Sequence, residues 1–78
     1  IVLEALVAER ERQEQRYGMQ NHANNFWNVI ASKKVGDVAH QIQEQNDSSL
    51  FIEVVQTCAV YFAWAEAIHL NNKDKWKF

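Results

Sequence analysis

Residues 50 to 70 constrain the fold most, because almost every side chain in this stretch is apolar. The residues that interrupt it are Glu53, Gln56, Thr57, Glu66 and His69. A helix with apolar side chains on nearly all sides is normally buried on several of them. A chain of 78 residues can bury such a helix best at an interface between subunits. We do not expect the stretch to cross a membrane, because its longest run without a charge, residues 54 to 65, is too short to span a bilayer.

The composition of the whole chain favours helices and self-association. The chain has no proline and two glycines, so few residues break helices. Hydrophobic residues make up 47% of it, which is more than a small monomer readily hides. We therefore expect a homo-oligomer, either a dimer or a dimer of dimers. The formal net charge of −2 argues against DNA, RNA or an anionic membrane as the partner.

Cys58 is the only cysteine, which excludes an intramolecular disulfide. Its apolar neighbours predict a buried, inert thiol, and the expected location is a reducing cytoplasm. Because the chain begins with Ile1 rather than methionine, whether residues precede it stays open.

The periodicity of apolar residues predicts three helices within one domain that covers residues 1–78. The first spans 1–16, with Gly18 as its C-cap, and the spacing of Glu9 with Arg12, and of Arg10 with Glu14, allows ion pairs along it. The second spans 25–45, with Asn24 or Asn25 as its N-cap. The third spans 49–71, after a loop that ends in N-cap residues. The predicted fold is all-α: a three-helix protomer that forms a helical bundle, completed by dimerisation.

Two clusters of polar residues break the apolar pattern of the second and third helices. Lys33, Lys34 and Asp37 lie together on the second helix, and Glu53 and Gln56, three residues apart, share a face of the third. Polar groups are expensive to bury unless they are paired. The clusters therefore predict either a site or an internal network of salt bridges. Gly36, which lies within the first cluster, predicts close packing of the second helix against another backbone.

Five motifs, in their order and spacing, resemble those of the MazG-like family of all-α nucleoside triphosphate pyrophosphohydrolases, especially its short phage- and mobile-element-type members. Residues 9–13 resemble the opening E-R-x-R-Q, and residues 17–22 resemble the connector W-G-x-Q-N-H. Trp27 with Val29 and Ile30 resembles the W-x-x-I/V-L motif, and residues 53–56 resemble E-L-V-D/Q. Ala63, Trp64 and Glu66 resemble the segment that comes next in the family.

The resemblance implies Mg²⁺-dependent hydrolysis of a nucleoside triphosphate to monophosphate and pyrophosphate. Where the family carries the metal-binding E-E-x-G-E, however, this chain has Lys33, Lys34 and Asp37, and Gln56 stands at an acidic position. A lysine cannot ligate Mg²⁺, which prefers oxygen ligands. The candidate metal ligands are therefore Asp37 and Glu53, and the candidate phosphate or nucleotide contacts are Lys33, Lys34 and Gln56. No catalytic residue is assigned.

Three functions stay open, and we favour the first. The chain is a non-catalytic member with a degenerate active site, in which the lysines pair with Glu53 or Asp37 and the dimeric scaffold is kept. Alternatively it is a pyrophosphohydrolase with a reduced Mg²⁺ site, or a metal-free nucleotide or phosphate binder. Outside the clusters, we expect His22 to be a surface or capping histidine and Trp27 and Trp64 to lie in the core.

Overall fold

The computed structural model of the protein describes residues 1–18 and 20–72, and within them every regular element is an α-helix. The helices are α1 (Val2–Tyr17), α2 (Asn24–Gln43) and α3 (Asp47–Asn71). The prediction of an all-α, three-helix protomer is confirmed, with each helix within about two residues of its expected bounds. The tail after residue 72, for which the sequence predicted no regular element, lies outside the described residues.

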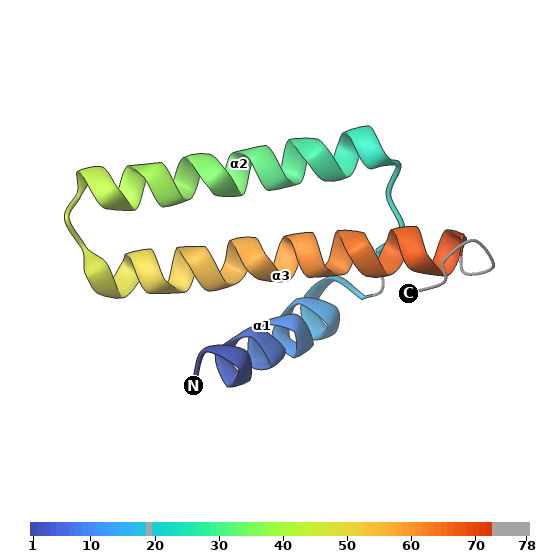
Figure 1. Cartoon of the computed structure of the whole chain (residues 1–78), viewed down its shortest axis with the longest axis horizontal. Helices are drawn as coiled ribbons and strands as arrows, with labels where there is room; N and C mark the ends of the chain where they lie inside the picture. Colours follow the sequence, from blue (N-terminus) through green and yellow to red (C-terminus); the bar gives the residue numbers. More distant parts are fainter. Residues whose placement is uncertain (19, 73–78) are drawn as a thin grey trace.

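The helices form an elongated bundle in which α3 is central. Figure 1 shows α2 running antiparallel along one side of α3, while α1 crosses α3 obliquely on another side. The radius of gyration is 13.7 Å, whereas a compact chain of this length would have about 11.5 Å. The protomer is therefore more open than its length requires.

The hydrophobic core lies between α2 and α3. Its main cluster consists of four buried residues, Trp27, Ala31, Val60 and Ala67, with Ile30, Ala63 and Trp64 packed against them. Ala59 of α3 is also fully buried but lies outside this cluster. Helix α1 has no buried residue. The expectation that Trp27 is a core residue is confirmed, since it is 2% exposed, and Trp64 is half-buried. A core of this size is small for the apolar content of the chain.

The ends of α2 differ from the sequence-based prediction for a physical reason. The N-cap of α2 is Ala23, without a side-chain hydrogen bond, so the prediction of Asn24 or Asn25 is wrong. The side-chain oxygen of Asn24 instead accepts a hydrogen bond from Trp64 Nε1 at 3.0 Å, which joins α2 to α3. The loop before α3 behaves as expected, because Asn46 Oδ1 accepts from the backbone N–H of Ser49 at 3.1 Å.

Gly18 is the C-cap of α1, as predicted, with a φ of 71° that favours glycine. The prediction for Gly36 is wrong within the protomer, because a Cβ added there would meet no atom within 4 Å. The prediction for Cys58 is also wrong, because this residue is exposed. Both errors come from treating α2 and α3 as buried on several sides, whereas much of their apolar surface is open in the single chain.

Helix α3 is long and apolar enough to cross a membrane, with a hydropathy of 1.3 over an 18-residue window. The length of the uncharged run 54 to 65 was therefore not sufficient to argue against a membrane span. A mostly buried core helix of a soluble protein passes the same test, whereas only 17% of this window of α3 is buried inside the protomer. Beyond its first turn, α3 carries the carboxylates of Glu53 and Glu66, which contact cations on α2 and α1 respectively, as expected of a helix that packs against polar neighbours.

Candidate functional site

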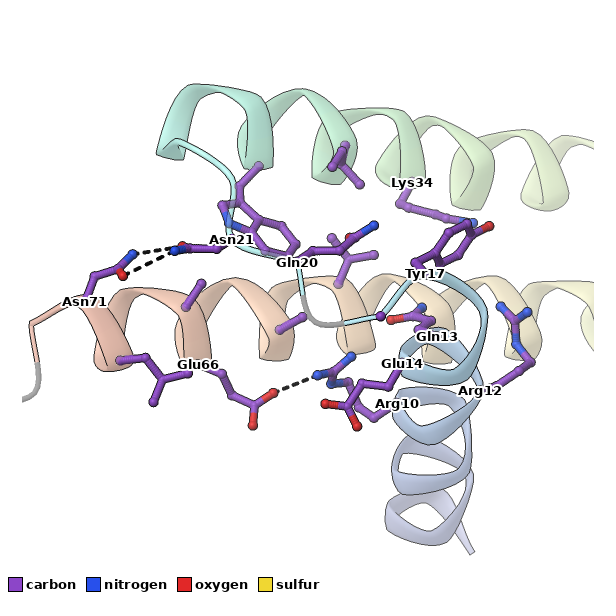
Figure 2. Close-up of a pocket in the computed structure, with 17 residues that line it drawn as sticks. Arg10, Arg12, Gln13, Glu14, Tyr17, Gln20, Asn21, Lys34, Glu66 and Asn71 are labelled. Atoms are coloured by element: carbon purple, nitrogen blue, oxygen red, sulfur yellow. Dashed lines mark hydrogen bonds and ion pairs between the residues drawn. The ribbon is translucent and has the colours of Figure 1, made fainter.

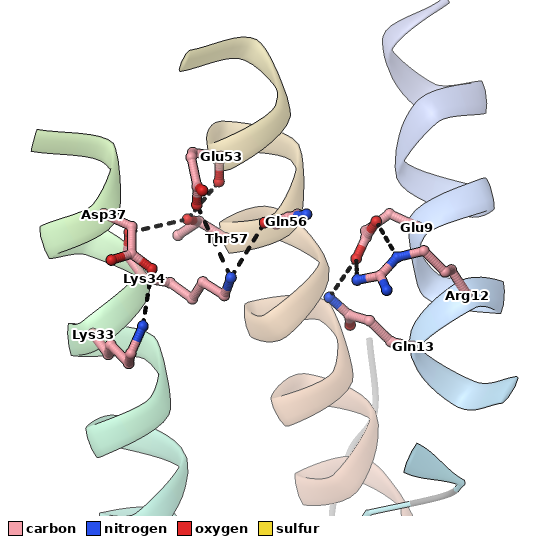
Figure 3. A network of polar contacts seen from close by, with 9 residues as sticks. All are labelled: Glu9, Arg12, Gln13, Lys33, Lys34, Asp37, Glu53, Gln56 and Thr57. Carbon is pink, nitrogen blue, oxygen red and sulfur yellow. Dashed lines mark hydrogen bonds and ion pairs between the residues drawn. The ribbon is translucent and has the colours of Figure 1, made fainter. Parts of the chain in front are cut away.

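The two polar clusters predicted from the sequence come together on facing sides of α2 and α3 (Figure 3). Lys34 Nζ donates a hydrogen bond to Gln56 Oε1 at 3.2 Å and lies 4.0 Å from Glu53 Oε2. The side chains of Lys34 and Glu53 are 27% and 22% exposed, so water screens this pair only in part. Residues of the two clusters therefore contact one another across the helix pair, as the salt-bridge alternative expects.

The second lysine forms its ion pair within α2 and does not reach α3. Lys33 Nζ lies 3.3 Å from Asp37 Oδ2, one helical turn away, and the Lys33 side chain is 76% exposed. The carboxylate of Asp37 is thus already paired with a cation. The two lysines therefore differ in their contacts. Lys34 connects α2 with α3, whereas Lys33 forms an ion pair only within α2.

Glu53 is the most constrained acid of the cluster. Its Oε2 is buried and accepts no hydrogen bond from the described residues, so the ammonium of Lys34 is the positive charge that faces it. One turn on, the hydroxyl of Thr57 donates to the backbone carbonyl of Glu53 at 2.7 Å. The same hydroxyl lies 3.5 Å from the backbone carbonyl of Lys34, which shows how closely α2 and α3 approach at this level.

These residues do not fit a Mg²⁺ ion. The two acids, Asp37 and Glu53, each face a lysine ammonium, and an ammonium repels a divalent cation while offering no lone pair to it. Among residues 1–18 and 20–72, no three His, Cys, Asp or Glu side chains gather as a metal-binding group. The donor set is that of an ion-pair network.

A cavity of about 500 Å³ lies next to this network, between the three helices (Figure 2). Helix α1 and the connector after it supply one wall, and α2 and α3 supply the other. Three cationic side chains line it, Arg10, Arg12 and Lys34, together with two acids, Glu14 and Glu66. Lys34 thus belongs both to the cavity and to the ion-pair network.

Long-range contacts hold the two ends of the cavity. Arg10 Nη2 donates to Glu66 Oε1 at 2.8 Å, so Arg10 does not use Glu14, the partner that its spacing allowed. At the other end the side-chain amide of Asn71 donates to Asn21 Oδ1 at 3.0 Å. Neither contact was predicted from the sequence. The only feature of the sequence that indicated the first contact was Glu66, an acid within an apolar helix.

A second carboxylate network lies within α1. Arg12 donates to both oxygens of Glu9, from Nε at 2.9 Å and from Nη2 at 2.6 Å, and Gln13 Nε2 donates at 3.0 Å. The pair predicted from the spacing is confirmed. These hydrogen bonds, above all the one from Arg12, hold the pKa of Glu9 below its ordinary value of 4.5, and the charge of Lys34 adds a smaller lowering. The same contact raises the pKa of Arg12.

His22 is half-buried and so does not lie fully at the surface, and the N-cap of α2 is its neighbour Ala23. Its ring packs edge-on against Phe26 and Trp27, with ring centroids 4.7 Å and 5.0 Å apart. The connector therefore folds back onto α2 and helps to cover the buried Trp27.

Comparison of the chain with models of known protein families, with characterised proteins and with solved structures finds no match.

Proposed function

We propose that this protein is a non-catalytic relative of the MazG-like pyrophosphohydrolases that serves as a self-associating helical scaffold in the cytoplasm. The observation that carries the proposal is the place of Lys34. Its ammonium lies between α2 and α3, bonded to Gln56 and 4.0 Å from the buried oxygen of Glu53. By the resemblance, this is where acidic side chains and a metal would meet.

Replacement of acids by lysines removes the need for a metal. Several carboxylates on facing helices repel one another unless a cation lies between them. Here the protein supplies that positive charge itself, with Lys34 facing Glu53 and Lys33 facing Asp37. The network then stabilises the helix pair permanently, and the chemistry that a divalent cation would provide is lost.

A second candidate function is the binding of a nucleotide or phosphate without a metal. The cavity supports it, because Arg10, Arg12 and Lys34 give its lining more cations than acids. All three cations already face carboxylates, Arg10 with Glu66, Arg12 with Glu9 and Lys34 with Glu53. An anion would have to compete with those pairs, so we favour the scaffold. A pyrophosphohydrolase with a reduced site has less support, since it needs Asp37 and Glu53 free to hold Mg²⁺.

The test compares the melting temperature of the parent and of the double variant Lys33→Glu with Lys34→Glu, with and without Mg²⁺. The variant is expected to be less stable than the parent without Mg²⁺, because a carboxylate at position 34 would face Glu53 and one at position 33 would face Asp37. If Mg²⁺ binds only the folded variant, tenfold more of it than the dissociation constant adds about 1.4 kcal/mol, or roughly 6–11 °C for a domain of this size. The parent is expected to gain nothing and to hydrolyse no nucleoside triphosphate.

Three outcomes separate the candidate functions. An equal gain from Mg²⁺ in both proteins would contradict the proposal, and pyrophosphate release by the parent would favour the reduced-site enzyme. Stabilisation of the parent by a nucleotide in the presence of a chelator would favour the metal-free binder. Lys33→Glu alone is the matched control, because Lys33 does not contact α3.

A further inference from the structure

The outer face of α3 carries a continuous apolar stripe that the protomer leaves open. The outer stripe consists of residues spaced alternately three and four apart, Phe51, Val54, Cys58, Tyr61 and Ala65. All are exposed: Phe51 at 45%, Val54 at 42% and Tyr61 at 46%, with Cys58 and Ala65 in the same class. This spacing is that of the a and d positions of a coiled coil, which form the seam between two helices.

The outer stripe differs from the other open apolar surfaces of the described residues, because it contains no charged or amide side chain. On α2, the face that carries the exposed Val35 and Ile42 also carries Asn28 and Ser32. On α1, the exposed Leu3 and Val7 are next to charged residues. A helix face without polar groups gains most from a helix that covers it.

The exposed surface of the chain matches the needs of a dimer. A monomeric protein of 9.1 kDa exposes about 4,900 Å², and this chain exposes 6026 Å². The excess exceeds the roughly 800 Å² that each partner buries in an interface of standard size. A second copy of the chain is therefore the occupant that the surface fits best.

We propose that the outer stripe is the dimer interface and that it pairs with the outer stripe of a second copy in the antiparallel direction. This inference rests on the proposed self-association but not on the loss of catalysis. The two-fold axis passes between Cys58 and Tyr61, so that Cys58 of one copy faces position 61 of the other. Val54 then faces position 65, and Phe51 faces position 68.

Side-chain size and helix dipoles favour the antiparallel direction over the parallel one. In the antiparallel pair each larger side chain meets a smaller one, Tyr61 against Cys58 and Val54 against Ala65, so the layers fill evenly. A parallel pair in register would place Tyr61 against its own copy and leave a gap between two Ala65 side chains. It would also align the helix dipoles, whereas the antiparallel pair opposes them.

Sedimentation over a wide range of concentration tests the interface with the full chain. The parent is expected to be a dimer, and Val54→Glu is expected to weaken it at least about a hundredfold, because a symmetric interface buries the new charge twice. Ile42→Glu is the matched control, since Ile42 is 59% exposed on α2, and this variant is expected to remain dimeric. Circular dichroism is the control, and both variants are expected to keep their helices.

Crosslinking then tests the direction. Under mild oxidation, Tyr61→Cys is expected to form a covalent dimer through Cys58 of one copy and the new thiol of the other, identified by peptide mass. The parent should crosslink poorly through two Cys58 residues, because these lie offset along the antiparallel axis and a disulfide needs Cα atoms within about 7 Å.

Four results would overturn the inference. They are a monomeric parent at every concentration, equal weakening by Ile42→Glu and Val54→Glu, efficient crosslinking between the Cys58 residues of the parent, and co-sedimentation of the protein with phosphatidylcholine vesicles. The last would identify a lipid surface as the occupant. None depends on Mg²⁺ or nucleotide, so this inference and the loss of catalysis fail separately.

Discussion

The two junctions that α3 makes within the protomer are built on different physical principles. The junction with α2 contains the main buried cluster, with Trp27 at 2% exposure and Ala31 fully buried. The junction with α1 contains no buried residue of α1. It is held by Arg10, whose guanidinium bonds to Glu66 and lies 5.9 Å from the centre of the Phe62 ring. We call the first the hydrophobic junction, and the second, in which an ion pair lies beside half-buried apolar residues such as Ala5 and Leu6, the electrostatic junction.

This difference implies that one junction provides most of the stability of the fold and that the other responds to salt and pH. Burial of apolar surface is insensitive to moderate changes of salt and pH, whereas partly exposed ion pairs respond to both. The pair of α2 and α3 is therefore the stable unit, and α1 is the part that opens first. The cavity lies between the two and opens together with α1, since α1 supplies one of its walls.

Trp27→Ala should break the hydrophobic junction and have the largest effect. Removal of a buried tryptophan side chain costs about 3–5 kcal/mol, and small domains have about 5–15 kcal/mol in total. Urea denaturation followed by circular dichroism should show a protein that is largely unfolded or close to it. Phe26→Ala, next to it but 51% exposed, should cost less than about 1 kcal/mol. Equal losses would show that the core does not lie between α2 and α3.

Arg10→Met should break the electrostatic junction and have a smaller, local effect. The loss of the bond to Glu66, whose side chain is 50% exposed, should cost about 1 kcal/mol. Amide hydrogen exchange should become faster in α1 and stay unchanged in the middle of α2 and α3. High salt should reduce the difference between the parent and the variant. Arg16→Met, on the same helix, is the control, and equally faster exchange in all three helices would contradict the comparison.

The sequence predicted what depends on neighbours along the chain. Helix bounds follow from apolar periodicity, from Gly18 and from the cap residue Asn46, all of which act within one or two turns. Two of the ion pairs between residues three or four apart, Glu9 with Arg12 and Lys33 with Asp37, were visible in the same way. The pairing of Lys34 with Glu53 was one of the alternatives, because the charged clusters had to face each other or face water.

The sequence could not predict contacts whose partners are far apart along the chain. Arg10 pairs with Glu66, 56 residues away. The side chain of Asn24 accepts a hydrogen bond from Trp64 instead of capping α2. Each of these choices depends on how α1 and α2 pack on α3, which periodicity does not specify. The burial of Cys58 was wrongly predicted for the same reason, because an apolar helix does not show which of its sides the other helices leave open.

Glu9→Gln should have the smallest effect and should reveal itself through pH. The pKa of Glu9 is held below its ordinary value of 4.5, first by its hydrogen bond from Arg12. A carboxyl group with a lowered pKa in the folded state stabilises fully above its unfolded pKa and loses that contribution as pH falls through its folded pKa. The free energy of unfolding of the parent should therefore exceed that of the variant by about 0.5 kcal/mol at neutral pH. This difference should disappear as the pH falls through the folded pKa of Glu9. Glu11→Gln, an exposed change on α1, is the control.

Titration of Glu9 by nuclear magnetic resonance links the two junctions. Arg12 is the largest cause of the lowered pKa and Lys34 of α2 is a smaller one, so Arg12→Met should raise the Glu9 pKa more than Lys34→Met does. The second shift should still be measurable, because the charge of Lys34 acts on Glu9 across the space between the helices. If Lys34→Met leaves the Glu9 pKa unchanged while Arg12→Met raises it, the networks of α1 and α2 are independent. If both variants raise the Glu9 pKa, the cation of the α2–α3 junction also acts on α1. Disruption of either junction should then change the electrostatics of the other.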